Sequence, residues 1–455
     1  MPDLIVRSRQ VVTPAGVLDA EVTVRDGRIA SISPPAGGSA VTDLGNLWLL
    51  PGFVDSHVHI NDPGRADWEG FATATSAAAV GGVTTLVDMP LNSIPATTSL
   101  EGLRAKQAAA RGVCQVDVGL WGGVIPGNTG ELEGLAAAGV CGFKCFLSPS
   151  GVEEFPHVSE RDLREAMPVI ARLGLPLLAH AELPEVLDRS ADELARDPRR
   201  YASWLASRPA EAEVQAIRLL IRLSEETGCA VHVVHLAAAE ALSDLRAARK
   251  RGLPITVETC PHYLYFCSEQ VPDGLTHFKC APPIRRAANR LQLQQALLAG
   301  EIDLVASDHS PCPPELKLAG GGDFSACWGG IASLGLGASV AWTAMEPLGA
   351  TPAHLAYWMS EAPARLAGLY PRKGVIAVGA DADLVAFDPA LKFTASEGQL
   401  QCRHKLSPYL GEQLQGVARQ TWLRGESVAE EWKAVGASLG QILGRARPDL
   451  PDGDR

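Results

Sequence analysis

Strand-like apolar runs alternate with alanine- and leucine-rich helical stretches through the middle of the chain, from about residue 51 to residue 364. The strand-like runs lie at residues 53–60, 83–89, 116–124, 142–147, 175–182, 230–237, 255–260 and 302–309. Helical stretches are clearest at residues 99–111, 160–173, 209–227, 238–251 and 290–298. Eight strands with helical crossovers favour an α/β fold of the closed (β/α)8 TIM barrel type over a doubly wound open sheet. No G-x-G-x-x-G or Walker-type loop follows any of these runs, so nucleotide phosphate binding has no support.

The two ends of the chain show a different pattern, in which short β runs are separated by turns. Such runs lie at residues 4–6, 10–12, 21–24 and 28–32, and the pattern returns at residues 375–378 and 380–387. We therefore expect residues 1–50 and 365–430 to form one small β-sandwich domain, and residues 51–364 to form the barrel. Residues 431–455 are expected to form a C-terminal tail. A pair of unrelated β caps is the alternative.

The charge balance bears on the kind of partner. Asp and Glu number 52 against 40 Lys and Arg, a formal net charge of −12, whereas nucleic acids and anionic membrane surfaces select basic patches. Aromatic residues make up only 5% of the chain, which disfavours stacking platforms for single strands. We expect a small-molecule substrate, with neither nucleic acid nor a membrane as partner.

Cysteine usage and the N-terminal segment indicate a reducing compartment. Ten cysteines in 455 residues are too sparse for a disulfide scaffold, and no pair forms a C-x-x-C clip. The N-terminus has no basic segment followed by a long apolar one, as a secretory signal would. No uninterrupted apolar run reaches the roughly 18 residues that suggest a membrane span. A cytoplasmic protein is expected.

Histidine and aspartate side chains recur where the strand-like runs end, and in a barrel of this type the carboxy ends of the strands carry the functional site. The residues are His57 and His59 in the first run, His180 in the fifth, His235 in the sixth and Asp308 in the eighth. Residues two apart on a strand share a face, so both histidines of the first run point into the barrel mouth. A single histidine in such a place is more often a packed or capping residue. Five candidates at four strand ends instead predict a site for borderline divalent metals.

Lys144 interrupts the apolar fourth run, Gly142-Phe143-Lys144-Cys145-Phe146-Leu147. An ammonium group is costly to bury there and cannot coordinate a cation. Three explanations are open: the side chain extends out of the barrel to the surface, it is a low-pKa amine that forms a Schiff base, or it has captured CO₂ as a carbamate. Beside four histidines the carbamate explains most, because its carboxylate head can bridge two metal ions and helps to neutralise them.

The order His-x-His, strand-four lysine, single His, single His and single Asp resembles the amidohydrolase superfamily, in its cyclic-amidase (dihydropyrimidinase-like) branch. Further segments resemble the allantoinases of that branch, among them Ser307-Asp308-His309-Ser310-Pro311-Cys312-Pro313-Pro314 and Glu258-Thr259-Cys260-Pro261-His262-Tyr263. The likeness extends from about residue 4 to residue 425.

Neighbouring groups of the branch match less well. Dihydroorotases typically carry an arginine two residues after the His-x-His, where this chain has Asn61. Dihydropyrimidinases and hydantoinases favour a tyrosine in the loop after the lysine, and here that loop is Ser148-Pro149-Ser150-Gly151. One departure from the allantoinase pattern is Ala281, where a serine commonly precedes two prolines. If the position works through its backbone, alanine is tolerable there; if it works through a hydroxyl, the assignment of the substrate weakens.

The resemblance implies two divalent metal ions per subunit, zinc first, with cobalt, manganese or nickel as alternatives. The implied ligands are His57, His59 and Asp308 for one ion, His180 and His235 for the other, and Lys144, carbamylated by CO₂, which bridges both. A hydroxide between the metals would attack an amide carbonyl of a hydantoin ring. Asp308 would be the catalytic acid and base.

The implied reaction opens the ring of allantoin to allantoate in purine (ureide) catabolism. The implied substrate contacts are the side chains of Asn92 and Ser310, for which loop and cap formation is the alternative, and the backbone around Ala281 and Gly329. The family also implies a homotetramer. Two further functions stay open: a hydantoinase or dihydropyrimidinase acting on other cyclic amides, and a non-catalytic scaffold of the same fold.

Overall fold

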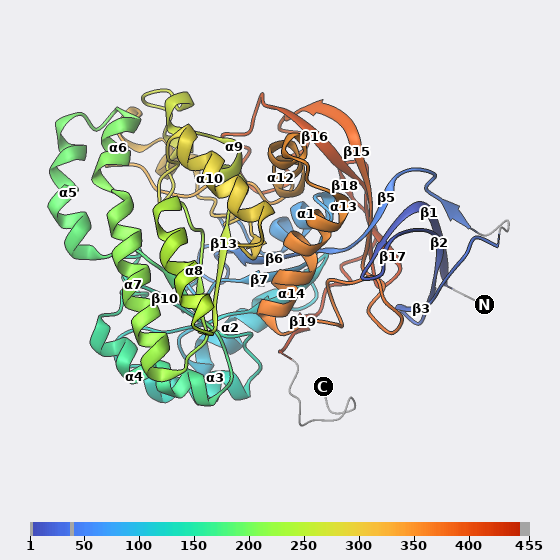
Figure 1. The fold of residues 1–455 in the computed structure, drawn as a ribbon, viewed down its shortest axis with the longest axis horizontal. Coiled ribbons are helices and arrows are strands. Elements are labelled where there is room, and N and C mark those ends of the chain that lie inside the picture. Colours follow the sequence, from blue (N-terminus) through green and yellow to red (C-terminus); the bar gives the residue numbers. More distant parts are fainter. Residues whose placement is uncertain (1–2, 37–40, 446–455) are drawn as a thin grey trace.

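The computed structural model describes residues 3–36 and 41–445, and its centre is a barrel of parallel strands (Figure 1). The barrel strands are β6 (Phe53–Val58), β7 (Val83–Asp88), β8 (Asp117–Leu120), β10 (Phe143–Phe146), β11 (Leu177–His180), β12 (Val231–Val233), β13 (Ile255–Thr259) and β14 (Leu304–Val305). Each lies within one of the eight runs expected from the sequence. Their burial on both faces explains why the runs are apolar throughout.

The ladder of strands closes on itself. It runs from β6 through β7 to β8, and from β9 (Gly122–Gly123) through β10, β11, β12 and β13 to β14. Val58 at the end of β6 then forms a parallel bridge with His309, beyond β14, and the His59 N–H donates to the His309 carbonyl at 2.8 Å. The prediction of a closed barrel over an open sheet is therefore confirmed.

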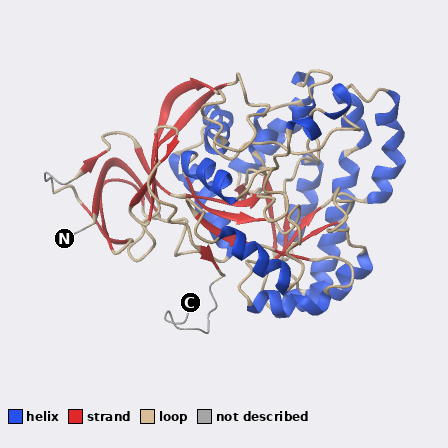
Figure 2. Ribbon diagram, turned by 180° about the vertical axis from the view of Figure 1, so that it is seen from behind, coloured by secondary structure: helices blue, strands red, loops and turns tan. Residues whose placement is uncertain are grey.

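Helices cover the outside of the barrel (Figure 2). They include α1 (Phe71–Val80), α2 (Leu100–Ala110), α3 (Leu132–Ala137), α4 (Glu160–Arg172), α7 (Ala210–Thr227), α8 (Leu242–Lys250), α10 (Ala287–Leu298) and α14 (Ala362–Ala367). Serine side chains begin two of them: Ser99 accepts from the Gly102 N–H, and Ser159 forms a capping box with Asp162. Helices α5 (Pro184–Arg196) and α6 (Tyr201–Ser207) are inserted between β11 and α7. No helix of the described residues combines the length and apolar character that crossing a membrane requires.

Both ends of the chain contribute to one nine-stranded sheet beside the barrel. From the N-terminal part come β1 (Leu4–Thr13), β2 (Gly16–Arg25), β3 (Arg28–Ser33), β4 (Thr42–Asp43) and β5 (Trp48–Pro51); from the other end come β15 (Leu384–Thr394), β16 (Gln413–Leu423), β17 (Glu426–Glu430) and β18 (Lys433–Ala434). β5 joins the two parts, since it pairs with β1 on one side and β15 on the other. Buried side chains of β1, β2 and β3 pack with Ala386 and Trp422 in one core, so the sheet folds over itself as a sandwich.

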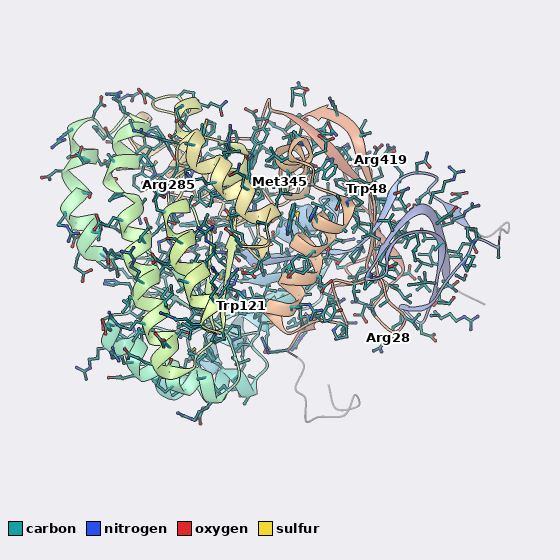
Figure 3. All side chains as sticks on the ribbon, in the orientation of Figure 1. Arg28, Trp48, Trp121, Arg285, Met345 and Arg419 are labelled. Carbon is teal, nitrogen blue, oxygen red and sulfur yellow. The ribbon has the colours of Figure 1, made fainter. Side chains whose placement is uncertain are left out.

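Buried charges tie this sheet to the barrel. The Lys373 ammonium lies 2.6 Å from Asp117 on β8, 3.0 Å from Asp381 and 2.6 Å from Asp383, which lies just before β15. Arg424, after β16, also donates to Asp117. Figure 3 shows Trp121 among the barrel strands and Trp48 and Arg419 on the sheet.

The segment after the sheet returns to the barrel. β19 (Ile442–Leu443) lies parallel to β8, pairing Ile442 with Val118 and Leu443 with Gly119. The expected 431–455 segment thus contains β18 and β19, and its residues 446–455 lie outside the described residues.

Candidate metal centre and substrate pocket

The carboxy ends of the barrel strands surround a pocket of about 300 Å³. Its lining includes His57, His59, His180, His235 and Asp308, together with Asn92, Ala281, Ser310 and Gly329. The backbones of His235 (φ 40°) and Asp308 (φ 46°) adopt the left-handed region. Such strain persists where the surrounding structure imposes it, and here it occurs at two residues whose side chains face the pocket. A pocket of this size suits a small ring compound.

Three of the expected ligands meet at one point. The Nε2 atom of His57 lies 3.2 Å from Oδ1 of Asp308, and Nε2 of His59 lies 3.4 Å from the same oxygen. The ligand atoms of these three buried residues lie within 4.8 Å of one another. Two imidazoles and a carboxylate form a donor set that suits a divalent cation.

His180 and His235 form a second group. Nδ1 of His180 lies 3.0 Å from Nε2 of His235, and Nδ1 of His235 has no hydrogen-bond partner among the described residues. Burial lowers the pKa of both rings, and that of His59. These three imidazoles are therefore held neutral, which is the form that coordinates a metal. Despite burial, Asp308 and Glu258 raise the pKa of His57. The site as a whole is compatible with divalent metal.

Lys144 lies in β10, two residues before Phe146, which lines the pocket; Lys144 itself is not among the lining residues. Its side chain is fully buried, so the explanation in which it extends to the surface is wrong. Its Nζ atom donates to the Cys145 carbonyl at 3.3 Å and lies 3.9 Å from the centre of the Phe146 ring, with no hydrogen-bonded carboxylate among the described residues. By contrast, buried Lys106 lies 2.5 Å from Asp88. Burial lowers the pKa of Lys144 to about 8, so the neutral amine, which is the form that reacts with CO₂ or a carbonyl, is more populated than in an exposed lysine.

Glu258, on β13, is a residue that reasoning from the sequence missed. Its Oε1 lies 2.5 Å from Nδ1 of His57 and its Oε2 lies 3.0 Å from Nε2 of His232. Burial raises the pKa of Glu258, but His57 and the hydrogen bonds outweigh burial and hold it below its usual range. The ionised carboxylate accepts the Nδ1 proton of His57 and leaves Nε2, the atom nearest Asp308, free to coordinate.

Glu182 orients the His180 ring in the second group, as Glu258 orients His57 in the first. Its Oε2 lies 2.7 Å from Nε2 of His180, so the Nδ1 atom of that ring faces His235. Arg208, which lines the pocket, donates to both oxygens of Glu182. The signal that singled out Lys144 would have found both glutamates, since each is a charge in an apolar run.

We expect Glu258→Gln to weaken metal retention about 10- to 100-fold, because a neutral amide no longer fixes the His57 ring as a carboxylate does. The measurement is metal loss to a competing chelator, followed by elemental analysis. Glu412→Gln is the matched control, since Glu412 accepts a hydrogen bond from Tyr265 at 2.8 Å away from the pocket lining. Equal metal retention in both variants would contradict the orienting role of Glu258.

The four expected substrate contacts differ in whether their polar groups are already hydrogen-bonded within the protein. The Asn92 Oδ1 atom is buried without a partner, and the backbone N–H groups of Ala281 and Gly329 have no acceptor in the described part of the chain. The Ser310 hydroxyl is already engaged: it lies 2.8 Å from the Asp308 carbonyl and 3.0 Å from its Oδ1. Ser310 therefore supports Asp308, an arrangement the sequence did not indicate.

The chain belongs to the amidohydrolase family, whose model matches residues 48–428. It is accordingly a hydrolytic enzyme. Its sequence groups with the allantoinases: that of Streptomyces avermitilis is 47% identical over 97% of this chain and 99% of its own length. The allantoinase of Saccharomyces cerevisiae is 44% identical, over 97% of this chain and 95% of its own.

Solved structures agree on the fold. The L-hydantoinase (dihydropyrimidinase) of Arthrobacter aurescens superimposes with a TM-score of 0.92 at 32% identity, over 98% of this chain and all of that one. The dihydropyrimidinase of Brevibacillus agri gives a TM-score of 0.89 at 29% identity, over 98% and 100% of the two chains. The barrel with a β-sandwich beside it is therefore a shared architecture.

Proposed function

We propose that this enzyme is an allantoinase, which hydrolyses the hydantoin ring of allantoin to allantoate. One observation carries the proposal: four histidines and an aspartate converge on one pocket, in a chain 47% identical to an allantoinase over nearly its whole length. Because these residues are intact, a non-catalytic scaffold is disfavoured. Divalent metal bound in the purified protein is expected, and its absence after growth with added zinc or cobalt would favour the scaffold.

We also propose which residues would hold the metal ions. One ion would be held by His57, His59 and Asp308, the other by His180 and His235, with Lys144 as a carbamate between them. Zinc suits imidazole and carboxylate donors, and elemental analysis distinguishes it from cobalt, manganese or nickel. When bound, such ions supply Lewis acidity, which polarises an amide carbonyl and lowers the pKa of water.

The protein groups supply proton transfer. Asp308 is ionised, because His57 and its other neighbours hold the pKa of its carboxyl well below the usual range despite burial. Asp308 takes a proton from the attacking water and delivers it to the ring nitrogen, while the ring C–N bond breaks and the carbonyl carbon gains the oxygen. The hydrogen bond from the Ser310 hydroxyl orients this carboxylate.

Other groups would hold the ring. The backbone N–H groups of Ala281 and Gly329 are free to donate to ring carbonyl oxygens, and Asn92 Oδ1 is free to accept from the ureido group. Since the contact at Ala281 is made by the backbone, alanine is tolerated where a serine is common.

The test is a comparison of turnover on allantoin, hydantoin, dihydrouracil and dihydroorotate with metal-loaded protein. We expect the highest kcat/KM for allantoin. The solved hydantoinase with a TM-score of 0.92 makes a hydantoinase or dihydropyrimidinase activity the second candidate. A preference for hydantoin or dihydrouracil would establish it in place of the first.

The organisation of the protein completes the proposal. Residues 1–50 and 365–430 would form the small β domain, residues 51–364 the catalytic barrel, and residues 431–455 a terminal segment. We expect a homotetramer by light scattering coupled to gel filtration, and a cytoplasmic location by fractionation of the source cells.

A further inference from the structure

A buried ammonium group gathers three backbone carbonyls beside the pocket. The Nζ atom of Lys317, at the end of the short helix α11 (Pro314–Lys317), donates to the carbonyls of Lys279 at 2.9 Å, Trp328 at 3.1 Å and Gly330 at 2.5 Å. The side chain is only 5% exposed. All three donors of the ammonium group thus bind backbone carbonyls. Lys317 and these three carbonyls, of Lys279, Trp328 and Gly330, are called the Lys317 clamp.

These carbonyls belong to two separate segments of the pocket wall. Residues 279 and 281 of the first segment line the pocket, and so do residues 327–330 of the second. The segments also touch directly, because the Gly330 N–H donates to the Lys279 carbonyl at 2.8 Å, and Lys279 Nζ donates to the Cys327 carbonyl at 2.6 Å. Lys317 therefore joins the stretch that carries Ala281 to the stretch that carries Gly329.

The clamp has no carboxylate in it. Among the described residues no Asp or Glu forms an ion pair with Lys317, whereas buried Lys106 and Lys373 each have aspartate partners. A buried cation without a counter-ion is costly, and three well-placed carbonyls are what compensates it here. An apolar side chain would fill the same space without that cost. The ammonium group therefore contributes through its hydrogen bonds, which hold the three carbonyls in place.

The second segment is close to the reacting groups as well. A Cβ atom on Gly330 (φ +121°) would come within 2.2 Å of the Ser310 carbonyl, so this backbone is pressed against the residue that supports Asp308. A Cβ atom on Gly329, by contrast, would meet nothing within 4 Å, since that residue faces the open pocket.

We infer that Lys317 is a positioning residue that sets the spacing between the two backbone segments, and with it the spacing of the Ala281 and Gly329 N–H groups toward the substrate ring. The inference rests on the proposed function for the role of those two N–H groups. It makes Lys317 a determinant of substrate affinity that never touches the substrate.

The test is the variant Lys317→Met, which keeps the length and apolar stem but removes the three donors. We expect KM for allantoin to rise about tenfold or more, the equivalent of about 1.4 kcal/mol, with kcat and metal content within about twofold of wild type. An unchanged KM would overturn the inference. So would a loss of kcat or metal without a change in KM, because the role would then lie in the metal centre.

Two variants keep this comparison interpretable. Lys405→Met is the matched control, since Lys405 donates to the carbonyls of Leu400 and Cys402 outside the pocket lining, and its KM should stay at the wild-type value. Lys317→Arg retains the charge, but its planar fork does not match three converging carbonyls. If Lys317→Met fails to fold, a KM rise in Lys317→Arg supports the inference, and a wild-type KM overturns it.

Hydrogen exchange separates this inference from the proposed function. Amides of residues 327–331 should exchange faster in Lys317→Met than in wild type or Lys405→Met, whichever substrate is turned over. If exchange is faster in Lys317→Met but the wild type does not turn over allantoin, only the proposed function is overturned. The KM values of the two proteins would then be compared on the cyclic amide that the wild type does hydrolyse. Unchanged exchange would overturn the inference alone.

Discussion

Replacing Lys144 with alanine is expected to reduce the turnover of allantoin by more than about 10³-fold, the equivalent of about 4 kcal/mol of transition-state stabilisation. Within residues 3–36 and 41–445, the buried Nζ atom has one hydrogen-bond acceptor, the Cys145 carbonyl, and it lies over the Phe146 ring. A cation is therefore weakly compensated there, whereas the charge of a carbamate would be compensated by bound metal ions. Without that bridge the two groups of histidines have no shared anionic ligand. Metal content per subunit, measured by elemental analysis, should fall together with activity.

Rescue by short carboxylates tests the carbamate directly. Acetate or propionate added to the Lys144→Ala protein together with metal should partly restore turnover, because each can occupy the place of the carbamate head. Lys392→Ala, which changes an exposed lysine of β15, serves as the control and should behave as wild type. Wild-type turnover and metal content in Lys144→Ala would show that the lysine does not bridge metals. A Schiff base at Lys144 would instead be trapped by borohydride in the presence of substrate.

Asp308→Asn is expected to lower kcat about 10²- to 10⁴-fold, the range for loss of a positioned acid and base. The amide cannot take up the proton from water, and it coordinates a metal less well than the carboxylate that lies 3.2 Å from His57 and 3.4 Å from His59. Partial metal loss is therefore expected as well. Steady-state kinetics on protein reloaded with metal separates the two effects.

The matched control for this variant is Asp244→Asn. Asp244 pairs with Arg218 at the surface, and its variant should keep wild-type kcat and metal. Full kcat in Asp308→Asn at full metal content would rule out proton transfer by this residue. A kcat restored wholly by excess metal would assign Asp308 to coordination alone.

Much of the barrel and the centre of its site could be predicted from sequence because both follow from local patterns. Eight apolar runs give eight strands, and a histidine at the end of a run must emerge at the mouth when all strands are parallel. Lys144 could be predicted as a functional residue because burying a charged side chain in an apolar strand costs free energy. Each of these features belongs to a single segment, and it keeps its place when the segments assemble into a closed barrel.

The contacts between segments could not be read in the same way. Glu258 reaches His57 from a strand 201 residues away in the chain, and which charged residue meets which histidine depends on how the barrel closes. Ser310 shows the same limit at short range, because the hydrogen bond from its hydroxyl to Asp308 depends on the loop conformation after β14. The Lys317 clamp joins segments from two loops, whose conformations carry no periodic signal.

The pairing of β19 with β8 bears on the order in which the molecule can be assembled. β19 fills an edge of the third barrel strand, and Gly440 and Arg445 extend this contact through hydrogen bonds to the backbone of Cys114 and Gly139. During synthesis all eight barrel strands leave the ribosome before this segment does. The edge of β8 that pairs with β19 therefore stays unpaired until residues 442 and 443 have been synthesised, so this pairing follows the synthesis of all eight barrel strands.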